Sequence, residues 1–513
     1  MTEKGYISDL YKQLEEVINK CDNLSRQAKD LEKKHKLEIA KLKEEHKKEI
    51  STLKNEVKTL KKENEKLKKE NEKLKKENIQ LKTEILKLKH KNNKDSSNSS
   101  KPSSTNGYKK VITNRREKSD KKRGGQLGHT GNCLSEENIK KIKASGKYKI
   151  EKHEINKNDN NKNSKPIIRK VIDIEIVTVI HEYWYYPDEN GKYNIPSIHM
   201  PKIQYGSNIK ALALDMMYEI YTSTDGVSTF ISRITNDCIN LSKGTLINWA
   251  INLNNKIQPE LENIEKKLLS SYYLNCDDSQ IKIDGDNYNN ICSCNDKYSR
   301  FWINKKRSKE ALEEIGFLNR FFGVIVKDGT DVYNGYGIKL SQCISHIQRY
   351  IKAIIDGNNH EGAKKMKKFF TTYNNLRNKL LLENKAKFSC EEYKNIIKEY
   401  EEILSFWKKE WMKSSPETNI VYDEERKLLT RLEENDKDQI LYFLTDFKVP
   451  STNNQAETDQ RNIKIKQKIG KFRSEFGAKI YANVRSCINT YKKNNINIFS
   501  SLKEALDDNL VII

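Results

Sequence analysis

The sequence predicts a multidomain protein: a long N-terminal coiled coil, a small β-containing module and a helix-turn-helix, then an α/β core with a helical insertion. Three observations support this. Leucines recur every seven residues near the N-terminus, short apolar and alternating runs between residues 270 and 345 predict strands, and residues 346–445 are strongly helical in pattern. With 513 residues, the chain is long enough for several domains.

The composition indicates a partner of opposite charge. Charged residues make up 33% of the chain, and the formal net charge is +24. A protein this basic usually binds a polyanion, so DNA or RNA is the first expectation and an anionic membrane surface the second. No stretch approaches the roughly 18 consecutive apolar residues that span a bilayer, and no signal-peptide core is expected. The nine scattered cysteines suit a reducing cytoplasm.

Residues 7–92 carry a heptad repeat that predicts a leucine zipper. The repeated leucines are Leu53, Leu60, Leu67, Leu74, Leu81 and Leu88. The residues three positions before them are Ile50, Val57, Asn64, Asn71, Asn78 and Ile85. Leucine at d with β-branched residues or Asn at a is typical of a parallel two-stranded coiled coil. A single solvated charged helix is the alternative, and six regular heptads favour the zipper.

Two segments of different character follow the zipper. Residues 93–131 have the composition of a flexible basic linker. Its basic side chains could lie along DNA phosphates, and a linker that only improves solubility is the alternative. These side chains are Arg115, Arg116, Lys118, Lys121, Lys122 and Arg123. Residues 132–205 are expected to form the small β module, because residues 167–186 alternate and are rich in β-branched and aromatic side chains.

Residues 206–256 are expected to hold the helix-turn-helix. Residues 227–234 predict a short amphipathic helix, and Ser242 is a suitable N-cap for a second helix. Candidate DNA contacts lie at the start of that second helix: Ser242, Lys243, Thr245 and Asn248. Most such helix pairs are only packing units, so this signal is weak in isolation.

The α/β core is predicted in two pieces, residues 265–345 and 446–490. The helical insertion, residues 346–445, separates them, and residues 491–513 form a C-terminal tail. Three strands are expected between residues 270 and 304, followed by a helix at residues 308–317. A fourth strand, Gly323 to Val326, leads to Asp328. This order matches the first half of a ribonuclease-H-like (retroviral-integrase-like) sheet, in which the first and fourth strands are neighbours.

Three carboxylates are candidate metal ligands. Asp277 lies in residues 275–279, with which the first predicted strand ends. Asp328 ends the fourth strand, and Glu457 lies where a later helix should begin. Carboxylates can hold two divalent cations that stabilise the attacking and leaving oxygens of a phosphodiester displacement, and Mg²⁺ prefers such oxygen ligands. For Asp328 the alternative is an ordinary Asp-Gly turn. The other carboxylates are expected to be turn or surface residues, with Asp278 the most serious competitor to Asp277: Asp278, Asp284, Asp286, Asp331 and Asp459.

In these features the chain resembles transposases of the insertion sequence sixty-six family, which carry a DDE (Asp-Asp-Glu) catalytic core. The ordered matches are the zipper, residues 98–104, 124–129, 241–246, 277–279, 326–329 and 343–346, Arg349, residues 454–457 and Arg461. The resemblance implies that Asp277, Asp328 and Glu457 form a catalytic triad that binds Mg²⁺ or Mn²⁺. It also suggests near-site support from Cys343, His346, Arg349 and Asn454.

The chain departs from that family in one place. The family's β module usually carries two Cys-x-x-Cys zinc knuckles, but the equivalent residues 149–154 and 185–192 contain no cysteine. Cys292 and Cys294 lie elsewhere, in a predicted strand. We therefore expect the module to persist as a fold without binding zinc.

The expected function is a transposase that binds terminal inverted repeats as a zipper-linked dimer or larger assembly and performs cleavage and strand transfer. The resemblance implies a cytoplasmic, nucleoid-associated prokaryotic protein, with accessory proteins of the same element as candidate partners. Further phosphate contacts are expected from Arg461, Lys464, Lys466 and Lys468, although a solvated basic face is an alternative. A catalytically inactive DNA-binding protein or repressor is the rival reading. A structural coiled-coil protein is a third, and it leaves the three acids unexplained.

Overall fold

The computed structural model describes residues 3–92, 94, 98, 135–146, 148–153, 168–196, 201–416 and 419–508. The chain divides into two compact units, Met1–Asn92 and Asn93–Ile513. The basic linker residues Arg115, Arg116, Lys118, Lys121, Lys122 and Arg123 lie outside the described residues. Their contacts with phosphate therefore stay a prediction.

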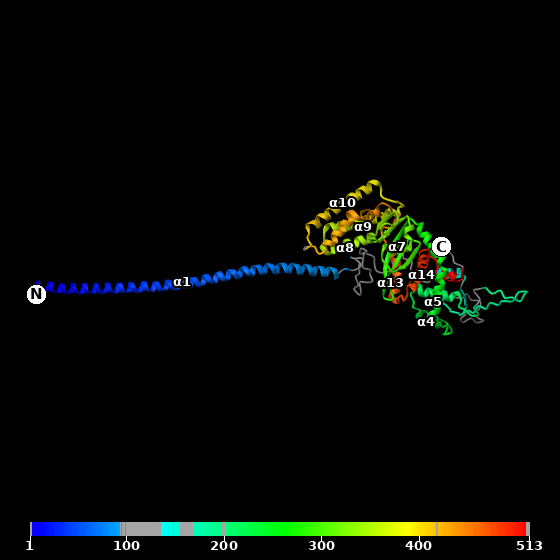
Figure 1. The fold of residues 1–513 in the computed structure, drawn as a ribbon, viewed down its shortest axis with the longest axis horizontal. Coiled ribbons are helices and arrows are strands. Elements are labelled where there is room, and N and C mark those ends of the chain that lie inside the picture. The colour runs from blue at the N-terminus through cyan, green and yellow to red at the C-terminus, as the bar shows by residue number, and fades with distance from the viewer. Residues whose placement is uncertain are drawn as a thin grey trace. The chain divides into compact units, whose positions relative to one another are not determined.

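The first unit is one uninterrupted helix, α1 (Glu3–Asn92), drawn in blue in Figure 1. Its repeated leucines are exposed in the single chain, for example Leu60 at 63% and Leu88 at 54%. An apolar stripe along a charged helix is stable in water when another surface covers it. No helix in the described part of the chain is long and apolar enough to cross a membrane.

The second unit begins with helices that precede the sheet: α2 (Glu136–Ala144), α3 (Ser207–Tyr218), α4 (Thr224–Ile234), α5 (Lys243–Lys256) and α6 (Gln258–Leu269). The helix-turn-helix elements appear as α4 and α5. The predicted N-cap is confirmed, because Ser242 Oγ accepts a hydrogen bond from Thr245 N at 3.0 Å.

The strands expected at residues 167–186 are not observed. Residues 168–196 contain no strand, and their apolar side chains are exposed, including Val171 at 91% and Trp184 at 74%. Alternation of β-branched residues suits a pleated surface, but a strand also needs a neighbour to take its backbone N–H and C=O groups. The backbone hydrogen bonds described within this segment close only the turn between Asp188 and Lys192.

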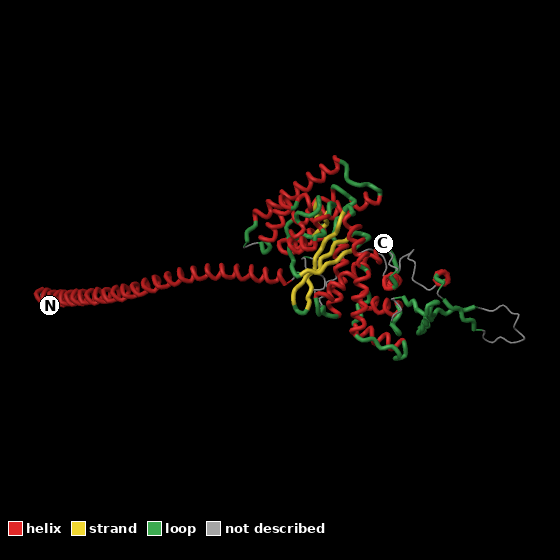
Figure 2. The backbone as a smooth tube through the Cα atoms, turned by 45° about the vertical axis from the view of Figure 1, so that its right-hand side comes forward, coloured by secondary structure: helices red, strands yellow, loops and turns green. Residues whose placement is uncertain are grey.

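The sheet has five strands: β1 (Tyr273–Ile283), β2 (Asp286–Cys294), β3 (Ser299–Asn304), β4 (Val324–Lys327) and β5 (Lys339–Gln342). Their order is β3-β2-β1-β4-β5, drawn in yellow in Figure 2. The first three pair antiparallel, whereas β4 pairs parallel with β1 and with β5. The predicted order of three strands, a helix and a fourth strand is confirmed. β5 was not predicted, because its four residues form no apolar run.

The first strand is longer than predicted. β1 does not end at Asp277 but continues to Ile283, because it keeps pairing with β2 up to the hairpin turn. Its pairing with β4 stops at Asn275 opposite Val326. Asp277 and Asp278 therefore lie inside a strand, where one neighbouring strand has already ended.

The remaining helices are α7 (Lys309–Ile315), α8 (Ile344–Asn358), α9 (Glu361–Leu382), α10 (Cys390–Lys413), α11 (Tyr422–Thr430), α12 (Lys437–Leu441), α13 (Asn454–Ile469), α14 (Glu475–Lys493) and α15 (Ile498–Leu506). Helices α8–α12 form the predicted insertion, with a hydrophobic core of their own around the fully buried Trp407. Figure 1 shows α8–α10 in yellow-green to yellow.

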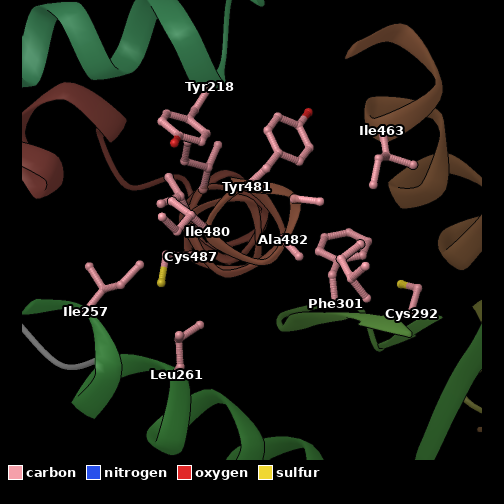
Figure 3. Packing of buried hydrophobic residues seen from close by; sticks show 14 of the residues in the cluster. Tyr218, Ile257, Leu261, Cys292, Phe301, Ile463, Ile480, Tyr481, Ala482 and Cys487 are labelled. Carbon is pink, nitrogen blue, oxygen red and sulfur yellow. The ribbon is translucent and has the colours of Figure 1, made fainter. Parts of the chain in front are cut away.

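The main core lies around α14, which Figure 3 shows end-on. Tyr481 stacks on Tyr218 of α3 with ring centroids 5.8 Å apart, and Phe301 of β3 faces the same helix. Trp302, the next residue of β3, contacts Phe317 on the opposite face of the sheet. Helices α3–α6 thus share one hydrophobic core with the sheet. Residues 491–508, expected as a tail, form the end of α14 and α15 and bury Leu502, Ala505 and Leu506.

Candidate active site

Parallel pairing of β1 and β4 brings the first two acids together. The last paired residues are Asn275 and Val326, and Asp277 and Asp328 each follow two residues later. Because parallel strands rise by about the same distance per residue, the two aspartates leave the paired region at the same level. Asp328 begins a turn in which its Oδ1 accepts a hydrogen bond from Thr330 N at 3.0 Å.

Helix α13 is attached to the same end of β1 by buried amide side chains. Asn275 Nδ2 donates to Asn453 Oδ1 at 3.0 Å, and Asn453 Nδ2 donates to the Cys276 carbonyl at 2.8 Å. Two turns further on, Gln460 Nε2 donates to the Asp277 carbonyl at 3.1 Å. Glu457 lies between these two anchors in the first turn of α13. The expected support residue, Asn454, is exposed, and the buried Asn453 makes these contacts instead.

The two neighbouring aspartates of β1 face opposite sides of the sheet. Successive strand side chains alternate, so Asp277 shares its face with Asn275, which contacts the start of α13. Asp278 faces the other side, where Arg307 Nε lies 2.5 Å from its Oδ2. Its side chain is 7% exposed. Asp278 is thus not the surface or turn residue that was expected.

Negative charge is concentrated around Asp277. Burial raises the pKa of Asp277 well above its ordinary value, and Asp328, Asp278 and Glu457 raise it further, in that order of effect. Burial also raises the pKa of Asp278, against the opposing effect of Arg307. Carboxylates gathered in this way repel one another unless a cation lies between them. The cluster therefore has the charge of a cation site.

Cys343, His346 and Arg349 adjoin Glu457, as the resemblance implied. His346 Nδ1 lies 3.7 Å from Glu457 Oε1, and Arg349 Nη2 lies 3.6 Å from Glu457 Oε2. Cys343 precedes α8, and its Sγ accepts a hydrogen bond from Asn453 N at 3.1 Å. Burial raises the pKa of the Cys343 thiol. These residues connect the start of α8 to the start of α13.

The arrangement of His346 shows which ring nitrogen carries its proton. Arg349 Nη1 lies 3.2 Å from His346 Nε2, and an arginine can only donate, so Nε2 is the acceptor and Nδ1 bears the hydrogen. Burial lowers the pKa of His346, and Arg349 lowers it further. A neutral ring with Nδ1–H directed at Glu457 can orient the carboxylate.

The donor set fits a hard divalent cation at the carboxylates. Glu457 Oε1 is buried without a hydrogen-bond partner, and Asp277 is surrounded by like charge, so both have oxygen lone pairs for a cation. Among the described residues, the ligand atoms of Cys343, His346 and Glu457 all lie within 4.8 Å of one another. The carboxylate oxygens of Asp277, Asp328 and Glu457 do not form such a group. That second set does not fit a metal, because the proton on His346 Nδ1 occupies the position that would coordinate.

A second group of cysteine and acid side chains, Cys292, Cys294 and Asp459, also lies within 4.8 Å. Asp459 Oδ2 accepts hydrogen bonds from Ser299 Oγ at 2.7 Å and from Lys493 Nζ at 2.8 Å. Lys493 is an amine cation with a buried side chain, so it already neutralises this carboxylate. This group has the partners of a structural ion pair, and zinc remains unexpected there.

The candidate DNA contacts occupy two helices. Arg461, Lys464 and Lys468 follow Glu457 at intervals of four, three and four residues, which places all of them on one face of α13. Arg461 and Lys468 are exposed, whereas Lys464 is half-buried and donates to the Gln280 carbonyl. Burial lowers the pKa of Lys464 and of Lys466.

At the start of α5, Lys243 forms an exposed ion pair with Asp225 at 2.9 Å. Thr245 hydrogen-bonds to Ser242. Asn248 is exposed. Two of the four candidates therefore contribute to the helix cap itself, and Lys243 and Asn248 present polar groups to solvent.

Some residues of the site had no sequence signal. Arg307 lies between β3 and α7 in a run of basic residues, and nothing local distinguishes it from its neighbours. Tyr333 is buried, and burial followed by the charge of Asp278 raises its pKa well above the ordinary value. Both depend on contacts with β1 that only the folded chain creates.

A mixed sheet that brings carboxylates together from neighbouring strands and a helix can hold the divalent cations used in phosphodiester chemistry. Comparison with known protein families matches residues 202–480 to the Transposase IS66 family. The match spans more than half of the chain, so this chain belongs to the IS66 transposase family. Membership implies an enzyme that binds, cleaves and transfers DNA. A search of curated proteins gave no match.

Proposed function

We propose that the protein is a DDE transposase with Asp277, Asp328 and Glu457 as its catalytic carboxylates. It would bind the terminal inverted repeats of its element and catalyse metal-dependent DNA cleavage and strand transfer. The observation that carries the proposal is the parallel pairing of β1 with β4, which brings Asp277 and Asp328 to one level beside the anchored start of α13. The charges of Asp328, Asp278 and Glu457 add to burial in raising the pKa of Asp277. Three acids distant in sequence thus act on one another, and the strand order matches a ribonuclease-H-like core.

In this mechanism the three carboxylates would hold Mg²⁺ or Mn²⁺. Bound ions of this kind supply Lewis-acid stabilisation of the attacking and leaving oxygens. The protein's own part is to orient the ligands. His346 Nδ1–H and Arg349 direct the Glu457 carboxylate, and Asn453 and Gln460 fix α13 against β1. Asp278, held by Arg307 on the opposite face, supports the strand.

The proposed DNA path runs along α13. Arg461, Lys464 and Lys468 continue the face of the helix on which Glu457 lies, so a strand whose phosphate reaches the acids would meet them in succession. Lys243 and Asn248 on α5 are proposed as contacts with the element ends.

Assembly is proposed to depend on α1. Its leucines, exposed in one chain, would pair with those of a second copy, and the Asn residues at the a positions would select a parallel dimer. Two copies joined in this way could hold both ends of the element in one complex. Accessory proteins of the same element remain candidate partners.

The test is cleavage and joining of labelled DNA that carries the element's own terminal repeats, with Mg²⁺ or Mn²⁺. Wild type would be compared with Asp328→Ala and with Asp286→Ala, an exposed hairpin aspartate, as the matched control. We expect metal-dependent joining by wild type and the control, and none by Asp328→Ala, which should still bind the ends. Binding without joining by any of the three, with accessory proteins supplied, would instead indicate a DNA-binding protein without catalysis.

A further inference from the structure

Arg431, a residue of the helical insertion, lies against Gly329 in the turn that carries Asp328. This residue begins the π-helical segment Arg431–Asn435 between α11 and α12. The wide turn is closed by Asp436 N donating to the Arg431 carbonyl at 3.1 Å. Short π segments inside helices are costly and are frequent at functional sites. Arg431 lies at the start of this segment, and its side chain reaches Gln342 of β5.

The guanidinium of Arg431 is held on three sides. Nε donates to Asp436 Oδ2 at 2.7 Å, and Nη2 donates to Gln342 Oε1 at 2.8 Å. Its Cζ lies 5.6 Å from the centre of the Tyr350 ring of α8. Gln342 is buried, ends β5 and pairs with Lys327, the residue before Asp328. Arg431 therefore contacts the sheet beside the second acid.

The close approach of Arg431 explains the glycine after Asp328. A Cβ added to Gly329 would lie 2.7 Å from Arg431 Nη2 and 3.3 Å from Cζ. Gly329 is not among the glycines with positive φ, so its backbone would accept another residue. The sequence suggested that this glycine permits a sharp turn, but the structure shows that it makes space for a guanidinium.

The turn has few other supports. Asp328 Oδ1 accepts from Thr330 N, and Lys327 Nζ donates to the Thr330 carbonyl at 2.7 Å. Both bonds lie within the turn and would move with it. The start of the turn is held by the backbone, because Cys343 N donates to the Lys327 carbonyl at 2.8 Å. At Gly329 the described neighbour is the Arg431 guanidinium, which also bonds to Gln342 of β5.

We propose that Arg431 is a positioning residue through which the helical insertion holds the Asp328 turn in the geometry that binds a divalent cation. The inference rests on the proposed role of Asp328. It gives the insertion a part in the chemistry beyond separating the second and third acids. A guanidinium that packs on a turn and orients a ligand acts as an outer-shell partner of a metal site, and loss of such partners typically costs 10–100-fold in affinity.

The structure supplies two independent ways to remove this contact. Arg431→Ala deletes the guanidinium, and Gly329→Ala displaces it with a methyl group while Arg431 remains. Arg426→Ala is the matched control, because Arg426 belongs to α11 and pairs only loosely with Asp423, at 3.7 Å on the surface. Arg431→Lys keeps the charge without the planar group.

The experiment measures Mn²⁺ binding by electron paramagnetic resonance and melting temperature for the full-length chain on end DNA. We expect Arg431→Ala and Gly329→Ala each to weaken Mn²⁺ binding about 10–100-fold with little change in melting temperature. Arg431→Lys should recover part of the loss, and Arg426→Ala should match wild type. The double variant Gly329→Ala/Arg431→Ala should be no weaker than Arg431→Ala, because both changes remove one contact.

The outcomes separate this inference from the proposed function. Wild-type binding and joining with unchanged Mn²⁺ affinity in Arg431→Ala would overturn the inference alone. Additive losses in the double variant would also overturn it, because Gly329 would then act independently of Arg431. A wild type that neither binds Mn²⁺ nor joins DNA would overturn the proposed function, and the inference with it.

Discussion

Helix α13 carries two acids, Glu457 and Asp459, only two residues apart and in opposite situations. They lie about 200° apart around the helix and so face different parts of the core. Each has a cysteine within 4.8 Å: Cys343 beside Glu457, and Cys292 and Cys294 beside Asp459. Asp459 receives hydrogen bonds from Ser299 and Lys493, whereas Glu457 Oε1 is buried without one.

The difference separates a structural acid from the one that we propose as a metal ligand. Burying a carboxylate is costly unless it is paired and hydrogen-bonded, and Lys493 meets that requirement for Asp459. Glu457 has His346 Nδ1 at 3.7 Å and Arg349 Nη2 at 3.6 Å, which are longer than hydrogen bonds. The other two proposed acids, Asp277 and Asp328, share the site with it. The incomplete pairing of Glu457 is what suits it to hold an external cation.

The strongest test of this contrast replaces each acid by its amide. Glu457→Gln should reduce joining on the order of 10³-fold, because it removes a charge from the proposed metal site. Asp459→Asn should leave joining per folded molecule close to wild type. Both are measured on the same labelled ends at saturating Mg²⁺. Equal losses of activity in the two variants would remove the distinction.

For stability the order is expected to reverse, with Asp459 contributing more to the free energy of unfolding than Glu457. Asp459→Ala leaves the buried ammonium of Lys493 without its carboxylate and should lower the free energy of unfolding by about 3 kcal/mol. Adding Lys493→Met should recover much of that loss, because no unpaired charge remains. Glu457→Ala should cost far less, as it has no hydrogen-bonded partner. Chemical denaturation of the four proteins measures this, and a large cost for Glu457→Ala would contradict it.

A smaller effect is expected from His346, whose Nδ1 lies 3.7 Å from Glu457 Oε1. His346→Ala should raise the Mg²⁺ concentration for half-maximal joining about 10–100-fold, with the fold retained. His346→Asn, whose amide can still donate, should restore part of the affinity. A change in stability without a shift in the Mg²⁺ midpoint would show that His346 serves packing alone.

The smallest effect concerns pH and repulsion around Asp277. Its pKa in the folded state is raised above the ordinary 3.8, so its contribution to stability is present at low pH and is lost as pH rises through the folded pKa. In chelator at pH 8, Asp277→Asn should therefore melt about 2–4 °C above wild type. Added Mg²⁺ should reduce this difference in melting temperature, because it stabilises the wild type. A gap that is unchanged between pH 5 and 8 would rule out the proposed repulsion.

Local patterns in the sequence determined much of this protein. The apolar run before Asp328 forms β4, Ser242 caps α5, and residues 346–445 fold as an all-helical insertion. The three proposed acids also stood out in the sequence, because each was expected at the end of a strand or the start of a helix, although Asp277 proved to lie inside β1. These features depend on alternation, capping and turn chemistry, which neighbouring residues decide among themselves.

Only the tertiary structure decided the rest. It placed Asp277 on the strand face of Asn275, which bonds to Asn453, 178 residues away, and Asp278 on the opposite face beside Arg307. It added β5, Arg307 and Arg431, which carry no local signal, and it left residues 168–196 without the strand that their alternation suggested. The physical reason is the same throughout: a hydrogen-bond partner or a covering surface from a distant segment cannot be read from the residues that need it.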